Sequence, residues 1–401
     1  MEFEITTVVL LLSFAVAVIM GAVANKTNFC TMGAVSDWVN MGDTGRLGAW
    51  MLSIAIAIAG VLLLQFIYDI PLDSTLPPYL TSNFGWLRYI LGGFLFGIGM
   101  TLASGCGNKT MVNIGGGNMK SLVVLIVAGV FAYLMTKTSF YEVLFHSWVS
   151  ATTIDLTAFD MNGQSLDAIF LRIFGSSNTE LFHWLIGLLL MACFFFIAFR
   201  SKDLKSSPHN IVGGVVIGLA IVAGWYITGG TLGQEAIETV AWLDERPVGV
   251  GVQSYTFINP MGESITYLMD PMNTLLITFG VVAILGVITG SFVASILSKR
   301  FKIVWFYDRS DMVKHVFGAA LMGIGGVLGM GCTIGQGITG VSTLSVGSLL
   351  VLGSIIFGSA LTMKIIYYRM VYEEAGFIES LITSLVDLKL LTEKLRKLEK
   401  L

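Results

Sequence analysis

Charged side chains are scarce in this sequence. Lys and Arg number 23 and Asp and Glu number 26 among 401 residues, so 12% of the chain is charged. Soluble globular domains carry about 25% charged residues, so an ordinary water-soluble domain is excluded. The mean hydropathy of +0.81 agrees with this. A net charge of −3 defines no partner by itself, and we expect no nucleic-acid partner.

Cysteine and histidine are also few, with four of each. The cysteines are Cys30, Cys106, Cys193 and Cys332, and they form no CxxC pair and no Cys/His spacing typical of a zinc site. These spacings favour neither a disulfide framework nor a zinc site, and we expect no cofactor and no metal. Cys193, inside MACFFFIAF, is predicted to be a small buried apolar residue without a role.

Long apolar runs take the place of charge. Crossing a bilayer takes about 20 apolar residues of helix, and several runs reach that length. The acidic start, MEFEITT, lacks the basic segment of a cleaved signal peptide, so the first run is expected to be retained. We predict an all-α polytopic membrane protein with about nine transmembrane helices. They are expected at 7–24, 47–68, 88–105, 120–137, 181–199, 211–229, 274–297, 315–331 and 346–367.

The distribution of basic residues predicts the orientation in the membrane. If every predicted span crosses, 19 Lys and Arg residues lie on the face that holds the carboxyl terminus, and 4 lie on the other. Because basic residues accumulate on the cytoplasmic side, the N-terminus is predicted outside and the C-terminus in the cytoplasm. The loops 138–180 and 230–273 then face outward.

An internal repeat includes two of the cysteines. With Cys106 aligned on Cys332, 8 of the 15 positions in 92–106 and 318–332 are identical. Earlier in each half, CTMG at 30–33 matches NPMG at 259–262. We interpret these segments as two membrane repeats, at 1–137 and 211–370. Residues 138–210 would supply an outer loop and a linking transmembrane helix, and residues 371–401 a cytoplasmic amphipathic tail.

One linking span between two even-numbered halves turns the second half upside down. Inverted, pseudo-symmetric repeats are typical of transporters, whose substrate site lies near the midplane between the halves. The segments after the two repeat cysteines, GNKTMVNIGGGN and TIGQGITGVSTL, are too polar to face lipid. Such backbone persists at membrane depth only inside protein or beside a water-filled cavity, so we expect short re-entrant half-helices.

Cys30, Cys106 and Cys332 are the candidate substrate-pathway residues. Each stands at a predicted break, where a restarting helix would point its free N–H groups and positive dipole end inward and could hold an anion. Lys109 and Gln336 could line the pathway or satisfy backbone groups. The supporting candidates are the polar residues and glycines beside the breaks: Asn28, Thr31, Gly105, Gly107, Asn108, Lys109, Asn259, Gly331, Thr333 and Gln336.

Four motifs of this sequence occur together in one known family. They are NFCTMGAVSD at 28–37, ASGCGNKT at 103–110, SYTFINPMGES at 254–264 and GMGCTIGQGITG at 329–340, and they resemble the YeeE/YedE sulphur-transport family over residues 1–370. The resemblance implies a bacterial inner-membrane protein that takes up thiosulfate, with the motif cysteines along a narrow passage in an hourglass-shaped, pseudo-symmetric fold. It also implies a cytoplasmic TusA-like sulphur-carrier partner, expected here as a separate chain.

Two chemical hypotheses follow for the cysteines. Thiosulfate is a dianion, so its charge must stay solvated by half-helix N-termini and by weak S–H donors of neutral thiols along a central pathway. The alternative is a membrane sulphurtransferase that relays sulphane sulphur as cysteine persulfides, which requires activated thiols beside a base or cation. Lys109 lies three residues from Cys106, but Cys332 has no such neighbour, so transport is favoured over enzyme catalysis.

Energy coupling has two alternatives. Each negative charge that enters an inside-negative cell costs about 2.3 kcal/mol per 100 mV, and a dianion costs about twice that. No carboxylate lies in the middle of a predicted span. Transport is therefore either coupled to protons through Asp37 or Glu263, or driven by consumption of thiosulfate inside the cell. If they do not carry protons, Asp37 and Glu263 are expected to be capping or interface residues. A binding or sensor protein is a third class, and it would bind the anion without accumulating it.

The tail after Met370 has a pattern of its own. Leu381, Leu385, Leu388 and Leu395 lie near a 3.5-residue period, with Glu and Lys between them. The spacing predicts an amphipathic helix that is either solvated or used for docking or self-association.

Overall fold

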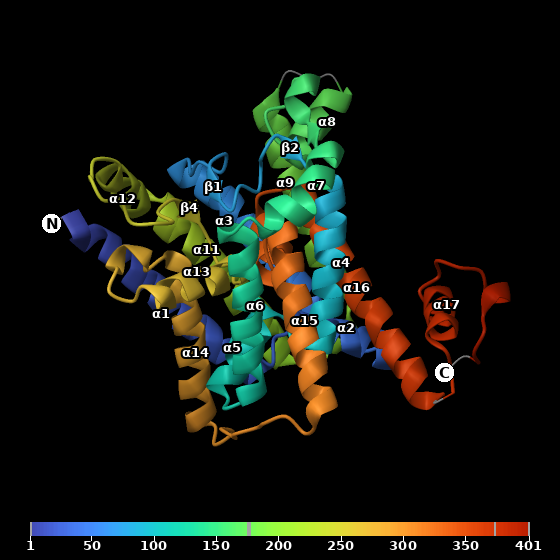
Figure 1. Ribbon diagram of the computed structural model, residues 1–401. Helices are drawn as coiled ribbons and strands as arrows, with labels where there is room; N and C mark the ends of the chain where they lie inside the picture. Colours follow the sequence, from blue (N-terminus) through green and yellow to red (C-terminus); the bar gives the residue numbers. More distant parts are fainter. Residues whose placement is uncertain (1, 175–177, 373, 400–401) are drawn as a thin grey trace.

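The computed structural model describes residues 2–174, 178–372 and 374–399, and most of them are helical (Figure 1). The long helices are α1 (Glu2–Thr27), α3 (Gly45–Tyr68), α4 (Trp86–Leu102), α6 (Met119–Lys137), α9 (Thr179–Arg200), α11 (Pro208–Gly229), α14 (Phe279–Leu297), α15 (Arg309–Leu328) and α16 (Val346–Val371). The shorter α-helices are α2 (Thr31–Ser36), α5 (Gly107–Gly115), α7 (Ser147–Thr152), α8 (Leu166–Phe174), α10 (Lys202–Ser206), α12 (Thr231–Ala241), α13 (Ile258–Met269) and α17 (Phe377–Asp387). The π- and 3-10 segments are η1 (Asp37–Met41), η2 (Glu142–His146), η3 (Leu156–Phe159), η4 (Thr274–Leu276), η5 (Gly335–Gly340) and η6 (Glu393–Leu395).

Nine helices of the described chain are long and apolar enough to cross a membrane, which confirms the predicted all-α polytopic fold. The starts of α14 and α15 differ from the predicted ones by several residues, and capping side chains explain both. Thr278 caps α14 by accepting from the Val281 N–H, so the helix begins after the apolar run has already started. Asp308 caps α15 by accepting from the Asp311 N–H, so a polar first turn precedes the apolar run.

The ends of the long helices define two faces. The basic face carries the connections 42–44, 116–118, 201–207 and 298–308, and the long-loop face carries 69–85, 138–174 and 230–278 (Figure 1). Two small sheets stand among the long loops. β1 (Thr75–Leu76) pairs in parallel with β4 (Val252–Gln253), and β2 (Asn83–Phe84) pairs antiparallel with β3 (Ile154–Asp155). The first pairing joins loops from the two expected halves of the chain.

Three spans are interrupted at the predicted breaks, between α1 and α2, between α4 and α5, and between α15 and η5. Ser104 and Met330, which align in the sequence repeat, both adopt left-handed backbone, with φ of 57° and 59°. In both turns the next glycine N–H bonds back to a carbonyl five residues earlier, at 2.9 Å from Gly105 and 2.7 Å from Gly331. The two helices therefore end in the same tight turn, which satisfies their last carbonyls.

Glycines bring α4 and α15 into backbone contact. A Cβ atom added at Gly92 would stand 2.8 Å from the Gly325 carbonyl oxygen, and one added at Gly99 would stand 2.6 Å from the Gly318 carbonyl oxygen. In the sequence repeat, Gly92 aligns with Gly318 and Gly99 with Gly325. The sequence repeat therefore maps one of these two contacts onto the other. Close packing of small residues is typical of membrane helices.

Helix α9 lies at the edge of the bundle, where it packs on α3. Its buried residues are Ile186, Gly187 and Ala198, which form one stripe. Cys193 lies off that stripe and is exposed, so the prediction that it is buried is wrong. A span that is apolar all round does not reveal which of its sides faces protein.

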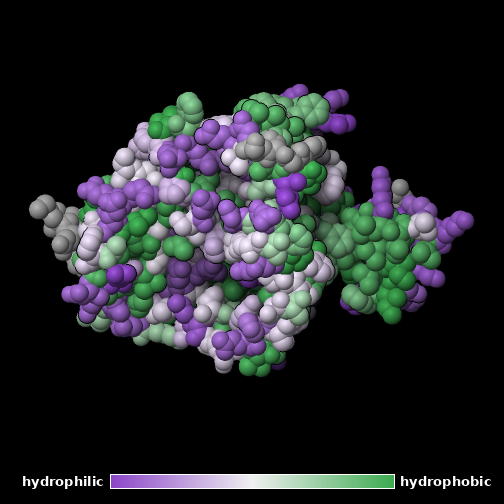
Figure 2. Space-filling view, turned by 90° about the horizontal axis from the view of Figure 1, so that it is seen from above, coloured by the Kyte–Doolittle hydropathy of each residue, from purple (hydrophilic) through white to green (hydrophobic). Residues whose placement is uncertain are grey.

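The carboxyl-terminal segment forms a lobe beside the end of α16 (Figures 1 and 2). The predicted amphipathic helix is present as α17, but it ends at Asp387. Lys389 has a φ of 60°, which turns the chain back, so Leu395 does not belong to this helix. The leucine period thus spans a helix and the segment that folds back against it.

Candidate functional site

Each of the three candidate cysteines stands directly before a helical segment. Cys30 is the N-cap of α2, and its Sγ accepts a hydrogen bond from the Gly33 N–H at 3.4 Å. Cys332 has the same geometry, with its Sγ 3.4 Å from the Gly335 N. Cys106 is the N-cap of α5. Helices restart directly after all three cysteines, as the breaks in the apolar pattern predict.

The structure brings the three thiols into one group. The Cys30 and Cys106 thiols lie close enough to interact with each other, and the Thr31 hydroxyl donates to the Cys106 Sγ at 3.9 Å. The Thr333 hydroxyl, which belongs to the residue after Cys332, also lies near Cys106 and is itself buried without a hydrogen-bond partner. The three cysteines are 4%, 1% and 0% exposed. Their side chains thus follow one another through the interior of the protein.

The motif SYTFINPMGES at 254–264 contacts the cysteine group from the side of α13. The Phe257 N–H lies against the Cys332 thiol, and the Thr339 hydroxyl donates to the Tyr255 carbonyl at 2.7 Å. A Cβ added at Gly107 would lie 3.5 Å from the Met261 Cε. All four sequence motifs therefore converge at the cysteines, although they are far apart in the chain.

Several buried polar atoms at this place have no partner. Among the described residues the buried side-chain atoms without one include Trp50 Nε1, Tyr79 Oη, Asn108 Oδ1, Thr256 Oγ1 and Asn259 Oδ1. An unsatisfied buried donor or acceptor costs about 1–3 kcal/mol, and native proteins hold few of them. Such a concentration indicates a place where a polar ligand or water completes the hydrogen bonds.

Contacts place three of these side chains near Cys332 and the helical segment that follows it. The Tyr79 side chain lies close enough to Cys332 for the two groups to interact electrostatically. The Thr256 hydroxyl would stand 2.2 Å from a Cβ at Gly335, and the Trp50 ring 3.0 Å from one at Gly337. Asn108 and Asn259 were candidates from the sequence. Trp50 and Tyr79 were missed because they lie outside the four motifs.

Lys109 and Asn28 meet on the basic-face side of the group. The Lys109 Nζ donates to the Asn28 Oδ1, and Asn28 is exposed with a φ of 54°. A Cβ at Gly105 would stand 3.3 Å from the Lys109 Cγ, so the glycine leaves room for the lysine stem. An ammonium group therefore stands three residues from Cys106, where the group of thiols approaches the surface.

Gln336 has a structural set of contacts. Its Nε2 donates to the Gly329 carbonyl at 2.7 Å, and its Oε1 accepts from the Ser348 hydroxyl. A Cβ at Gly331 would stand 3.1 Å from the Gln336 Cγ. Of the two alternatives for Gln336, these contacts match satisfaction of the backbone at the turn.

The two carboxylates considered for coupling have protein partners. Asp37 binds Arg46 through both carboxylate oxygens, with the Arg46 Nη2 2.6 Å from Oδ1. Glu263 accepts a hydrogen bond from the Thr278 hydroxyl. Both lie at interfaces between elements, which is the placement expected for them.

Two large hollows in the described part of the molecule do not reach the cysteines. One of about 870 Å³ on the long-loop face is lined by Asp73, Asp160 and Asp167. Another, of about 550 Å³, lies between α1, α12 and α14 and has mostly apolar walls. Neither suits an anion, because the first is acidic and the second lacks charge. The group of thiols is closed to solvent on both sides in this structure.

Comparisons with known proteins agree with this architecture. Residues 26–361, which include all three cysteines, match the sulphur transport family. A thiosulfate transporter TsuA from Escherichia coli (strain K12) is 24% identical over 340 residues, which is 80% of this chain and 84% of that protein. A thiosulfate transporter TsuA from Spirochaeta thermophila is 29% identical over 285 residues, 70% of this chain and 77% of that protein. The chain is thus a multi-pass membrane transport protein, and it belongs to the sulphur transport family.

Proposed function

We propose that this protein takes up thiosulfate across the bacterial inner membrane, along a passage that runs past Cys332, Cys106 and Cys30. Two relatives that each align with at least 70% of this chain are named thiosulfate transporters. The observation that carries the proposal is the group of three buried thiols among polar atoms that have no protein partner.

The chemistry of the group suits this anion. The terminal sulphur of thiosulfate is soft and would accept weak S–H hydrogen bonds, while its oxygens would accept from N–H and O–H donors. The Trp50 Nε1, the Tyr79 Oη and the Thr256 Oγ1 are donors that the protein leaves without partners. Asn108 and Asn259 can also donate, because a rotated amide presents its NH₂ group. A dianion can thus exchange its hydration shell for fixed donors instead of losing it.

The order of contacts supports a direction. Tyr79 belongs to the long-loop face and approaches Cys332, Cys106 follows, and Cys30 lies with Lys109 toward the basic face. If the basic face is cytoplasmic, with the N-terminus outside and the C-terminus inside, this order is the direction of uptake. Several weak sites in series let an ion leave as readily as it enters.

We further propose that the two halves are inverted repeats related by a pseudo-two-fold axis in the membrane plane. The paired glycine contacts between α4 and α15 support this, because a two-fold axis generates the contact of Gly99 with Gly318 from that of Gly92 with Gly325. The matched left-handed turns at Ser104 and Met330 support it too. Such an axis would put the thiols near the midplane, where inverted-repeat transporters bind substrate.

Consumption inside the cell is the favoured driving force. Against 100 mV, a dianion would reach an inner concentration roughly 1,000-fold or more below the outer one at equilibrium. Proton relay through Asp37 is disfavoured because Arg46 holds both of its oxygens. A separate TusA-like sulphur carrier at the basic face would keep the inner concentration low by removing the sulphur.

The test is uptake by the purified chain in proteoliposomes, with thiosulfate labelled separately on each sulphur atom. Transport predicts that both labels enter together and that Cys106→Ser slows their entry. The matched control is Cys193→Ser, because Cys193 is exposed and lies outside the group. Entry of one label alone, with a mass gain of one sulphur atom on a cysteine, would support a persulfide relay and defeat the proposal. Binding without accumulation would defeat it as well.

A further inference from the structure

The carboxyl-terminal lobe exposes large apolar side chains at the start of α17 and buries several of its hydroxyl side chains. Phe377 and Ile378 of α17 are exposed, Ile378 to 69% of its surface. Ser380, Thr383 and Ser384 of the same helix are fully buried. Two adjacent large apolar side chains exposed on one helix are unfavourable in water. The outward face of α17 therefore requires an apolar partner.

This apolar surface continues that of a transmembrane helix. Helix α17 packs beside the end of α16, whose exposed residues include Ile366, Met370 and Val371. Viewed from above, the lobe stands to the side of the bundle and is mostly hydrophobic on its surface (Figure 2). The exposed apolar residues at the end of α16 and those at the start of α17 thus lie on neighbouring helices.

Helix α16 also fixes the depth of the lobe. It has 26 residues, about 39 Å of helix, whereas the hydrocarbon core is about 30 Å thick. Its last turns carry Tyr367, which is exposed and belongs to a residue type that accumulates at the membrane–water boundary, next to the buried Tyr368. The Tyr368 hydroxyl donates to the Asp387 carboxylate at 2.7 Å, which holds the end of α17 at that level.

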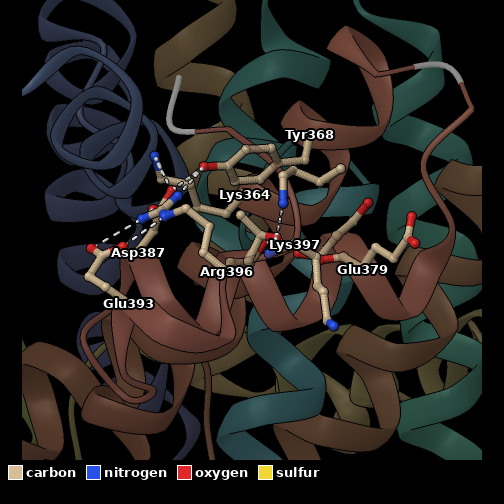
Figure 3. A network of polar contacts seen from close by, with 11 residues as sticks. Lys364, Tyr368, Glu379, Asp387, Glu393, Arg396 and Lys397 are labelled. Atoms are coloured by element: carbon tan, nitrogen blue, oxygen red, sulfur yellow. Dashed lines mark hydrogen bonds and ion pairs between the residues drawn. The ribbon is translucent and has the colours of Figure 1, made fainter.

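A network of ion pairs fastens the lobe to α16 (Figure 3). Asp387 accepts from Arg396 at 2.7 Å and lies 3.6 Å from the Lys364 Nζ, and Arg396 also binds Glu393 at 2.8 Å. Burial opposes ionisation of Asp387, but hydrogen bonds from Tyr368 and Arg396 and the charge of Lys364 lower its pKa below the usual value. The carboxylate is therefore the common anchor of the segment.

The buried polar face of α17 has its own partners. The Thr383 hydroxyl accepts from the N–H groups of Lys397 and Leu398 in the returning segment, and its own O–H donates to the Glu379 carbonyl. The Ser384 hydroxyl donates to the Ser380 carbonyl. Lipid offers no water to hydrogen-bond with polar groups. A segment whose polar groups are satisfied internally can therefore bury its apolar side in lipid.

We propose that residues 377–398 form an interfacial lobe that binds the membrane leaflet at the basic face, with Phe377 and Ile378 among the acyl chains. Lys389, Lys394 and Lys397 are exposed at its polar rim and would meet anionic lipid headgroups. Leu388 packs against the cluster of Val35, Ala360 and Met363, and Val35 belongs to α2, so the bound lobe also braces the re-entrant segment. This inference does not depend on which anion the protein transports.

Photo-crosslinking of the full chain in lipid nanodiscs tests the proposal. A p-benzoylphenylalanine side chain replaces Ile378 in one variant and Thr392, which is exposed at a polar turn of the same lobe, in the matched control. We expect at least fivefold more lipid adduct at 378 than at 392 by mass spectrometry. Equal yields would overturn the proposal, and so would a cross-link from 378 to a second copy of the chain, which would assign the surface to self-association.

A separate measurement tests the proposed contact of the three lysines with anionic lipid headgroups. Amide hydrogen exchange in α17 should be slower in nanodiscs that contain phosphatidylglycerol than in purely zwitterionic ones. Replacing the three rim lysines by glutamine should remove that difference while the adducts at 378 persist. Exchange that is the same in both lipids for the unmodified chain would overturn the role of anionic headgroups.

Discussion

Tyr79 provides a test in which stability and transport are expected to move in opposite directions. Its side chain is 2% exposed, and its hydroxyl has no hydrogen-bond partner in the described structure. Its carbonyl accepts from Gln164 and Ser345, both at 2.9 Å, and these bonds do not involve the hydroxyl. Tyr79→Phe therefore removes one unsatisfied polar atom and leaves the backbone and the ring in place.

The expected changes in stability and in uptake both follow from removal of the Tyr79 hydroxyl. An unsatisfied buried hydroxyl costs about 1–3 kcal/mol, so Tyr79→Phe should raise the free energy of unfolding by roughly 1 kcal/mol. If the hydroxyl donates to the passing dianion, the lost bond is worth about 1.5–3 kcal/mol, because the acceptor is charged. Uptake at low thiosulfate concentration should then fall about 10-fold or more.

Tyr255→Phe is the matched control. Tyr255 is equally buried, but its hydroxyl donates to the Ser13 carbonyl at 2.7 Å. This variant should lose stability by about 1 kcal/mol and transport normally per folded molecule. The assays are thermal unfolding in detergent and labelled uptake in proteoliposomes. Unchanged uptake by Tyr79→Phe, or a lower stability than the parent chain, would refute the reasoning.

Three further perturbations test the packing and the ion pairs. Gly99→Ala should destabilise the fold by about 1–3 kcal/mol, because its Cβ would stand 2.6 Å from a backbone oxygen of α15. Gly353→Ala, with nothing within 4 Å, should stabilise it by about 0.5–1 kcal/mol, and equal unfolding midpoints would contradict the close approach. Arg46→Gln should cost about 3 kcal/mol by leaving Asp37 unpaired, and adding Asp37→Asn should restore part of the folded yield; no restoration would exclude the pair as the cause. For Asp387, whose pKa is lowered on folding, the docking energy is complete above the ordinary pKa near 4 and is lost as pH falls through the folded value. Proteolysis of residues 377–398 should thus be constant between about pH 5 and 8 and increase only below about pH 4, and an increase near neutrality would contradict the anchor.

The spans and the breaks could be predicted because both are local properties of the sequence. Apolar runs locate the long helices, and glycine, asparagine and threonine beside Cys30, Cys106 and Cys332 mark where they stop. The repeat added a reason to expect two of the cysteines in equivalent turns. Hydropathy could not locate the capped starts of α14 and α15, because polar capping residues lie outside the apolar runs.

Contacts between distant segments could not be predicted in this way. Tyr79 lies in a loop and Trp50 in a span, and neither has a neighbouring motif that would connect it with Cys332. The exposed side of Cys193 and the outward apolar face of α17 also depend on tertiary packing. In a membrane protein an apolar side chain suits both lipid and core, so its side of a helix is not determined by composition.

The most direct test of the central claim is to locate the substrate itself. Crystals soaked in selenosulfate, in which selenium replaces the terminal sulphur of thiosulfate, would reveal that atom by its anomalous scattering. The passage proposed here predicts selenium beside Cys332 or Cys106, with the oxygens toward Tyr79 and Trp50. Selenium found instead in the apolar cavity between α1, α12 and α14, with none near a cysteine, would contradict it.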